Sequence, residues 1–187
     1  MEQLTLLPPA GFYRWLQLYL LYRTSFPWAE RKPFRVIRRM YREKTSDIWC
    51  LERNGIFLGF ASTMNSPDLI MLDYFAVSKR HRGQGIGTAA LQKLKICYGG
   101  KGIFLEIESP REPGPDQIRR EKRKQFYLRC GMEPLQVMAD VFGVKMELLG
   151  WNCQMDFPRY HAFYRDNYTP WAAAHIHEIP YPGAEET

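Results

Sequence analysis

The chain has 187 residues, of which 45% are hydrophobic and 25% are charged, proportions typical of a folded globular protein. Its net charge of +6 favours an anionic ligand: a nucleotide cofactor, a nucleic acid or an acidic lipid surface. The four cysteines form no CxxC pair, so neither a zinc ribbon nor a disulfide scaffold is indicated. The apolar runs are shorter than a membrane span, and the N-terminus lacks a secretion-signal pattern, so we expect a cytoplasmic protein.

Hydrophobic periodicity and turn signals predict a mixed α/β protein. In chain order we expect helices over 12–22 and 33–44, strands over 48–51, 56–60 and 69–77, a helix over 87–98, a strand over 103–108, a helix over 116–129, strands over 135–139 and 144–149, and a helix over 158–168. The Asn54-Gly55 turn makes the first two strands an antiparallel hairpin. Residues beyond 168 show no period from which an element can be predicted.

Basic residues and glycines coincide where the third predicted helix begins. The residues of this turn are Arg82, Gly83, Gln84, Gly85, Ile86, Gly87 and Thr88. Backbone N–H groups in the first turn of a helix have no intrahelical partner and lie at the positive end of its dipole. The glycines leave these groups open to a pyrophosphate, the arginine neutralises its charge, and the threonine hydroxyl adds a donor. The alternative is an exposed turn whose charges maintain solubility.

The same turn also fits a dinucleotide-binding fingerprint. Gly85, Gly87 and Ala90 have the GxGxx(G/A) spacing, and acidic residues follow about twenty positions later. In that fold, however, the first glycine follows the strand almost directly, whereas a basic segment separates Val77 from Gly85 here. Antiparallel hairpins also precede the crossover, and both features disfavour a nicotinamide cofactor.

Three ordered motifs extend the pattern beyond the turn. The turn itself fits (Arg/Gln)-x-x-Gly-x-(Gly/Ala) over 82–87, between the strand segments 72–77 and 104–108, and Phe126-Tyr127-x-x-x-Gly131-Met132 comes later. Together they resemble the GNAT superfamily of N-acetyltransferases over about 12–149. The resemblance implies a mixed α/β fold in which helices flank a central sheet of about six to seven strands. Its acetyltransferase domain would occupy 1–150, with 151–187 packed on it as a C-terminal extension.

The resemblance also implies a chemistry and its donor. Acetyl-CoA, the acyl-donor substrate, would insert its pantetheine arm between two parallel strands that splay apart and would pair with the backbone of Phe75, Ala76 and Val77. A primary amine would attack the thioester directly, and Tyr127 would protonate the departing thiolate. Without the resemblance, this tyrosine would be assigned to helix packing.

Three carboxylates are candidates for the general base. Strand alternation places Glu106 and Glu108 on one face of their strand, and Asp73 lies in the preceding strand. Such an acid could take the proton of the amine through an ordered water. Each could instead pair with arginines of the helix 116–129, or recognise a cationic acceptor.

The remaining expectations concern partners. We expect no metal, because His175 and His177 have no clear carboxylate or cysteine cluster beside them, and no membrane partner. The basic run 119–124 includes a glutamate within a predicted helix, which indicates a solvated face rather than a nucleic-acid site. The protein would be a monomer or a homodimer. The acceptor stays open among small amines, aminoglycoside-like compounds, amino acids, peptide N-termini and lysine side chains, and so does a longer acyl donor. The alternative function is a coenzyme-A-binding sensor or interaction module.

Overall fold

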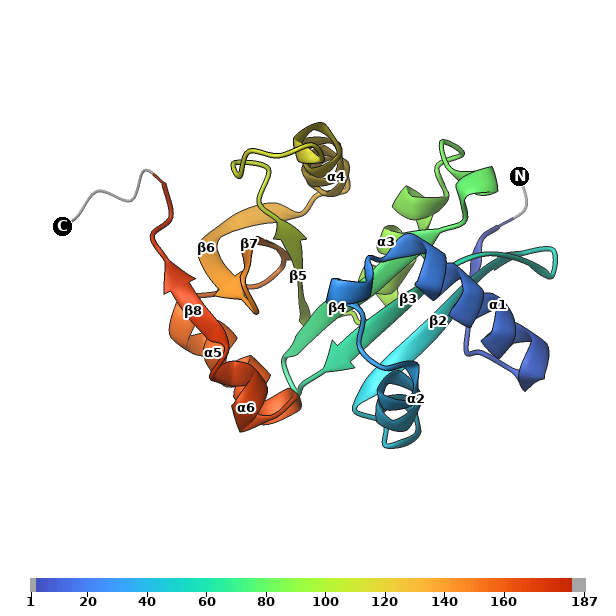
Figure 1. The fold of residues 1–187 in the computed structure, drawn as a ribbon. Helices are drawn as coiled ribbons and strands as arrows, with labels where there is room; N and C mark the ends of the chain where they lie inside the picture. Colours follow the sequence, from blue (N-terminus) through green and yellow to red (C-terminus); the bar gives the residue numbers. More distant parts are fainter. Residues whose placement is uncertain (1–2, 183–187) are drawn as a thin grey trace. The chain divides into compact units, whose positions relative to one another are not determined.

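The computed structural model describes residues 3–182, which divide into two compact units (Figure 1). The first unit contains the chain up to Asn65 together with Met71–Gly99, and the second contains Ser66–Ile70 and the chain from Gly100 onward. Each unit is described by itself. Every helix among the described residues is too short or too polar to cross a bilayer.

The first unit is a sheet with helices on both of its faces. Its elements are β1 (Thr5–Leu7), α1 (Gly11–Ser25), a 3-10 turn (Trp28–Glu30), α2 (Phe34–Arg42), β2 (Ser46–Arg53), β3 (Ile56–Asn65), most of β4 (Leu69–Val77), a second 3-10 turn (Lys79–His81) and α3 (Ile86–Cys97). The strand order is β1-β2-β3-β4, and β2 is antiparallel to both of its neighbours. The turn at Asn54-Gly55 has positive φ at both residues, as the predicted hairpin requires.

Two clusters of buried side chains fix the helices of the first unit. On one face, Leu18 and Tyr22 of α1 and Ile37 of α2 pack against strand residues that include Phe60. On the other face, Ile86 and Ala90 of α3 pack against a separate apolar cluster. The glycine turn therefore lies on the face opposite α1 and α2.

The second unit is built on an antiparallel sheet. Its elements are β5 (Gly102–Glu108), α4 (Gln117–Arg129), β6 (Glu133–Val141), β7 (Val144–Trp151), α5 (Phe157–Asn167), α6 (Pro170–Ala173) and β8 (Ile176–Ile179). The strand order is β5-β7-β6-β8, with every pair antiparallel. Strand β8 comes from the segment predicted as a C-terminal extension, and it pairs with β6 from Val141↔Ile176 to Met138↔Ile179.

The predicted mixed α/β class is confirmed, and every helix and strand that the sequence predicted is present. The expected strand number was too low, because residues 3–182 contain eight strands rather than six or seven. The two additional strands, β1 and β8, have three and four residues. Such short strands carry too few alternations to be detected by periodicity.

Gly59 of β3 is required by the close approach of β4. A Cβ at this position would lie 2.3 Å from the carbonyl oxygen of Ala76 and 3.1 Å from Cα of Val77. Ser78, which follows Val77 at the end of β4, donates its backbone N–H to the carbonyl of Leu58 at 2.8 Å. The absence of a side chain at 59 thus lets the end of β4 lie against β3, directly before the glycine turn.

We expect Gly59→Ala to lower the free energy of unfolding by about 1–3 kcal/mol, because the added methyl group overlaps backbone atoms that cannot rotate away. Urea denaturation checks this. Gly114→Ala is the control, since its Cβ would meet only the end of the flexible Arg120 side chain, at 3.0 Å. Equal stability losses in the two variants would contradict the close approach.

Candidate active site

The start of α3 has the geometry of an anion-binding turn. Gly85 is the N-cap residue, with φ +73°, and Gly83 has φ +75°. Among residues 3–182, no side chain caps this helix start, and its first turn contains no acidic residue. A Cβ at either glycine would meet no atom within 4 Å, so glycine is required by the left-handed backbone and not by crowding.

Side chains in the segment before α3 form hydrogen bonds within the turn and to the end of β4. Arg82 is exposed and donates from Nε to the carbonyl oxygen of Val77 at 3.0 Å, which leaves the other guanidinium donors for a ligand. Gln84 is also exposed, and its amide donates to the carbonyl of Arg80 at 3.4 Å. His81 and Ser78 share a hydrogen bond of 3.0 Å between Nδ1 and Oγ.

These features fit a pyrophosphate. Three favourable features meet at the start of α3: backbone N–H groups without a side-chain cap, the positive end of the helix dipole and an exposed arginine. The predicted pantetheine-binding residues Phe75, Ala76 and Val77 form the end of β4, so the first unit contains the whole set of residues predicted to bind acetyl-CoA.

Asp73 also lies in the first unit, where it is paired with a cation. The Nζ atom of Lys32 lies 2.7 and 2.6 Å from its two carboxylate oxygens. The backbone around Lys32 is held in turn, because its N–H donates to the Tyr74 hydroxyl at 3.1 Å and its carbonyl accepts from the Tyr22 hydroxyl at 2.9 Å. Asp73 would have to give up part of this ion pair to accept a proton.

Glu108 lies in the second unit and forms ion pairs with α4. Its carboxylate oxygens are 3.5 Å from Nη1 of Arg123 and 4.0 Å from Nε of Arg120. The alternative that the sequence left open for this acid, pairing with arginines of the basic helix, is therefore present.

Glu106 accepts hydrogen bonds from two phenol groups. The hydroxyl groups of Tyr160 and Tyr164, one turn apart on α5, both donate to Oε1, at 2.5 and 2.7 Å. Tyr160 is fully buried, and burial, followed by the nearby charge of Glu106, raises the pKa of its phenol well above the usual value. The phenol therefore stays protonated and acts as a hydrogen-bond donor.

Sequence reasoning did not find these two tyrosines as partners of Glu106. Their spacing of four residues in a predicted helix is a detectable signal, because it places both side chains on one helix face. Their common acceptor lies more than 50 residues earlier in the chain.

Tyr127 lies in the second unit near the end of α4 and is 8% exposed. Burial raises the pKa of its phenol to about 12, partly offset by the charge of Arg123, so the group is protonated at neutral pH. This state suits a proton donor. Three residues earlier, Lys124 forms an ion pair with the buried Glu147 of β7, which also accepts a hydrogen bond of 2.7 Å from Ser109.

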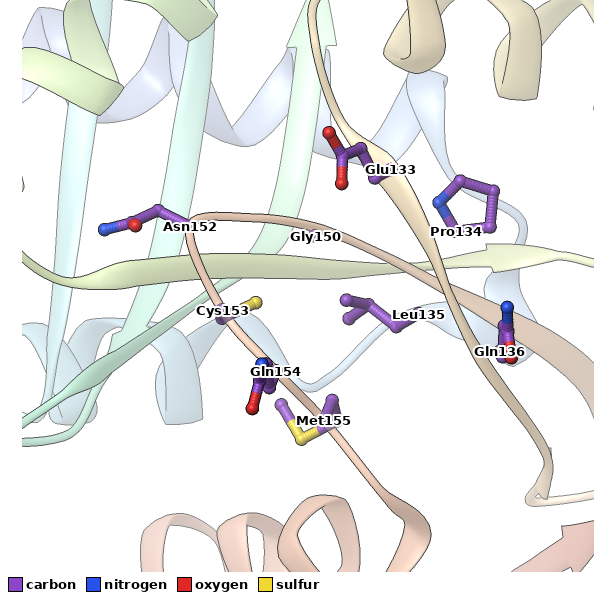
Figure 2. Close-up of a pocket in the computed structure, with 9 residues that line it drawn as sticks. All are labelled: Glu133, Pro134, Leu135, Gln136, Gly150, Asn152, Cys153, Gln154 and Met155. Carbon is purple, nitrogen blue, oxygen red and sulfur yellow. The ribbon is translucent and has the colours of Figure 1, made fainter.

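The second unit also contains a pocket of about 460 Å³ (Figure 2). It is lined by Glu133, Pro134, Leu135, Gln136, Gly150, Asn152, Cys153, Gln154 and Met155. It forms where the pairing of β6 with β7 shifts between Pro134 and Met138. None of the predicted site residues lines it.

Comparison with known proteins decides the family. Residues 14–132 match the model of the acetyltransferase (GNAT) family. The chain belongs to this family of acetyltransferases. It is 32% identical over 134 residues to YjbC of Bacillus subtilis, a protein named as an acetyltransferase, and the match covers 68% of this chain and 66% of YjbC.

Solved structures show the same GNAT fold. A GNAT-family protein of Bacteroides thetaiotaomicron has a TM-score of 0.68 at 18% identity, covering 89% of this chain and 98% of that one. The microcin C7 self-immunity acetyltransferase MccE, solved with acetyl-CoA and AMP, has a TM-score of 0.59 at 16% identity, covering 81% and 93%. The GNAT fold expected from the ordered motifs is thus confirmed.

Removing one phenol hydroxyl tests the Glu106 contact. We expect Tyr160→Phe to lower the free energy of unfolding by about 1.5–3 kcal/mol, because a partly buried hydrogen bond to a charged group is lost while the ring stays. In a Glu106→Gln background the same change should cost about 1 kcal/mol, the value for a neutral pair. Chemical denaturation of all four proteins measures this coupling, and identical losses in the two backgrounds would contradict the contact.

Proposed function

We propose that this GNAT acetyltransferase moves the acetyl group of acetyl-CoA to a primary amine by direct attack on the thioester. The observation that carries the proposal is the uncapped, left-handed start of α3 at Gly85, beside the exposed Arg82. Two similar folds support the choice of donor, because MccE was solved with acetyl-CoA and a Bacillus subtilis acetyltransferase was solved with CoA.

The donor would be held by the first unit. The N–H groups of residues 83–88 would solvate the pyrophosphate, together with the Arg82 guanidinium and the Thr88 hydroxyl. The backbone of Phe75, Ala76 and Val77 would pair with the pantetheine arm. A backbone N–H of this strand end would also polarise the acetyl carbonyl, which makes its carbon more electrophilic.

The reaction needs two proton movements. The amine nitrogen forms a bond to the carbonyl carbon, the carbon–sulfur bond breaks, and the sulfur takes the proton of the Tyr127 phenol. The surplus proton of the amine passes to a carboxylate, directly or through a water. The candidates are Asp73 and Glu108, which are each paired with cations, and Glu106, which accepts hydrogen bonds from Tyr160 and Tyr164.

The ion pairs of Asp73 and Glu108 also favour a second candidate function. A protein whose strand acids are engaged in structural pairs could bind coenzyme A as a sensor or interaction module without efficient transfer. The two functions differ in whether the protein acetylates amines at a rate that depends on the Tyr127 phenol.

We expect Gly85→Glu to weaken acetyl-CoA binding at least about tenfold, because a side chain strains the left-handed backbone and its carboxylate repels the pyrophosphate. Isothermal titration of the purified protein measures this. Gly55→Glu is the matched control, since Gly55 also has φ +73° and an open Cβ direction but lies in the β2–β3 turn. Wild-type affinity in Gly85→Glu would refute the pyrophosphate site.

Tyr127→Phe should lower kcat for amine acetylation about a hundredfold, the usual contribution of a general acid, while the Kd for acetyl-CoA changes less than about twofold. Steady-state kinetics and titration provide the two readouts. Unchanged kcat would remove the phenol from the mechanism. A folded wild-type protein that binds acetyl-CoA but acetylates no amine would favour the interaction module.

A further inference from the structure

The two helices on one face of the first unit expose apolar and basic side chains next to each other. Phe12, Leu16 and Leu20 of α1 follow one another at four-residue spacing and are 82%, 37% and 53% exposed. They form an apolar stripe about 12 Å long, from eight residues of helical rise. Large apolar side chains in such a continuous row are a sign of an interaction surface.

The exposed face of α2 is formed by arginines. Arg35, Arg38, Arg39 and Arg42 have the i, i+3, i+4, i+7 spacing of one helix face, and all four are exposed. Neither α1 nor α2 contains an acidic residue. Just past the end of α2, Glu43 lies 3.9 Å from Arg39, so one weak ion pair touches this row.

The apolar stripe and the arginine row meet in one groove. A cavity of about 450 Å³ between the helices is lined by Phe12, Trp15, Leu16, Tyr19, Phe34 and Arg38. The Arg38 guanidinium lies 5.0 Å from the centre of the Trp15 ring, which fixes a cation over the apolar floor. Whatever covers this surface must therefore offer apolar and anionic groups side by side.

We propose that α1 and α2 bind the surface of an anionic lipid bilayer. A helix lying flat in the interface buries its apolar stripe at the level of the acyl chains while neighbouring arginines contact the headgroups, and a bilayer supplies both phases together. This binding requires no spanning helix. It revises the expectation of no membrane partner, which rested on the absence of a spanning segment from the sequence.

Other partners satisfy only part of this surface. A second copy of the chain would place four arginines against four arginines, which is repulsive. A nucleic acid would satisfy the arginines and could stack on Phe12, but it offers no apolar phase to Leu16 and Leu20. The inference does not depend on acetyl transfer, because neither helix contains a residue assigned to the proposed reaction.

Co-sedimentation with lipid vesicles at low salt tests the proposal. The wild-type protein should sediment with phosphatidylcholine vesicles containing phosphatidylglycerol, and remain in solution with phosphatidylcholine alone. Arg35→Gln with Arg42→Gln should weaken partitioning about 25-fold, from about fivefold per arginine. The matched pair Arg119→Gln with Lys122→Gln removes the same charge from the exposed part of α4, and should change it less than about twofold.

A second pair of variants tests the apolar stripe. Phe12→Ser should weaken vesicle binding about tenfold or more, whereas Ile118→Ser, on α4 and 72% exposed, should leave it unchanged. All variants should keep the wild-type Kd for acetyl-CoA, which separates this result from the proposed function. The proposal is overturned if anionic vesicles bind no protein, or if the two charge variants lose binding equally, since net charge alone would then explain it.

Discussion

The left-handed backbone at Gly85 is the constraint on which the proposed acetyl-CoA site depends. A side chain here would be strained, and an aspartate or serine cap in its place would occupy the N–H groups that a pyrophosphate needs. The turn directly follows the end of β4, and this strand end can approach β3 because Gly59 has no Cβ. Arg82 ties the turn to that strand end through the Val77 carbonyl. Two glycines and one arginine thus fix the position of the turn that we propose binds the pyrophosphate.

Two carboxylates with protein partners organise the second unit. The partly buried Glu106 accepts two phenol hydrogen bonds from α5, and the buried Glu147 pairs with Lys124 of α4 and accepts a hydrogen bond from Ser109, which follows β5. A carboxylate withdrawn from water without partners would be costly, so each contact holds a helix against the strand that carries the acid. The position of Tyr127 is therefore linked to an ion pair one turn away. Structural pairing of this kind differs from the proposed anion site of the first unit, where no side chain among residues 3–182 caps the start of α3.

Local signals in the sequence predicted the main helices and strands, because each carries either a regular period or a glycine or proline at its end. Gly85 and the basic residues around it were identifiable for the same reason. The contacts of the carboxylates were not identifiable. Strand alternation places Glu106 on one face of its strand but does not show that Tyr160 is its partner. The exposure of Phe12 and Leu20 could not be predicted from the sequence either. Helical spacing indicates an apolar face, but only the packed structure shows which part of that face is covered. The short strands β1 and β8 depend on their neighbours in the sheet.

A crystal structure of the protein with acetyl-CoA would test the central claim most directly. The account predicts pyrophosphate oxygens within hydrogen-bonding distance of backbone N–H groups between Gly83 and Thr88, with the Arg82 guanidinium beside them. Pyrophosphate density elsewhere on the molecule, with the start of α3 facing solvent, would contradict it.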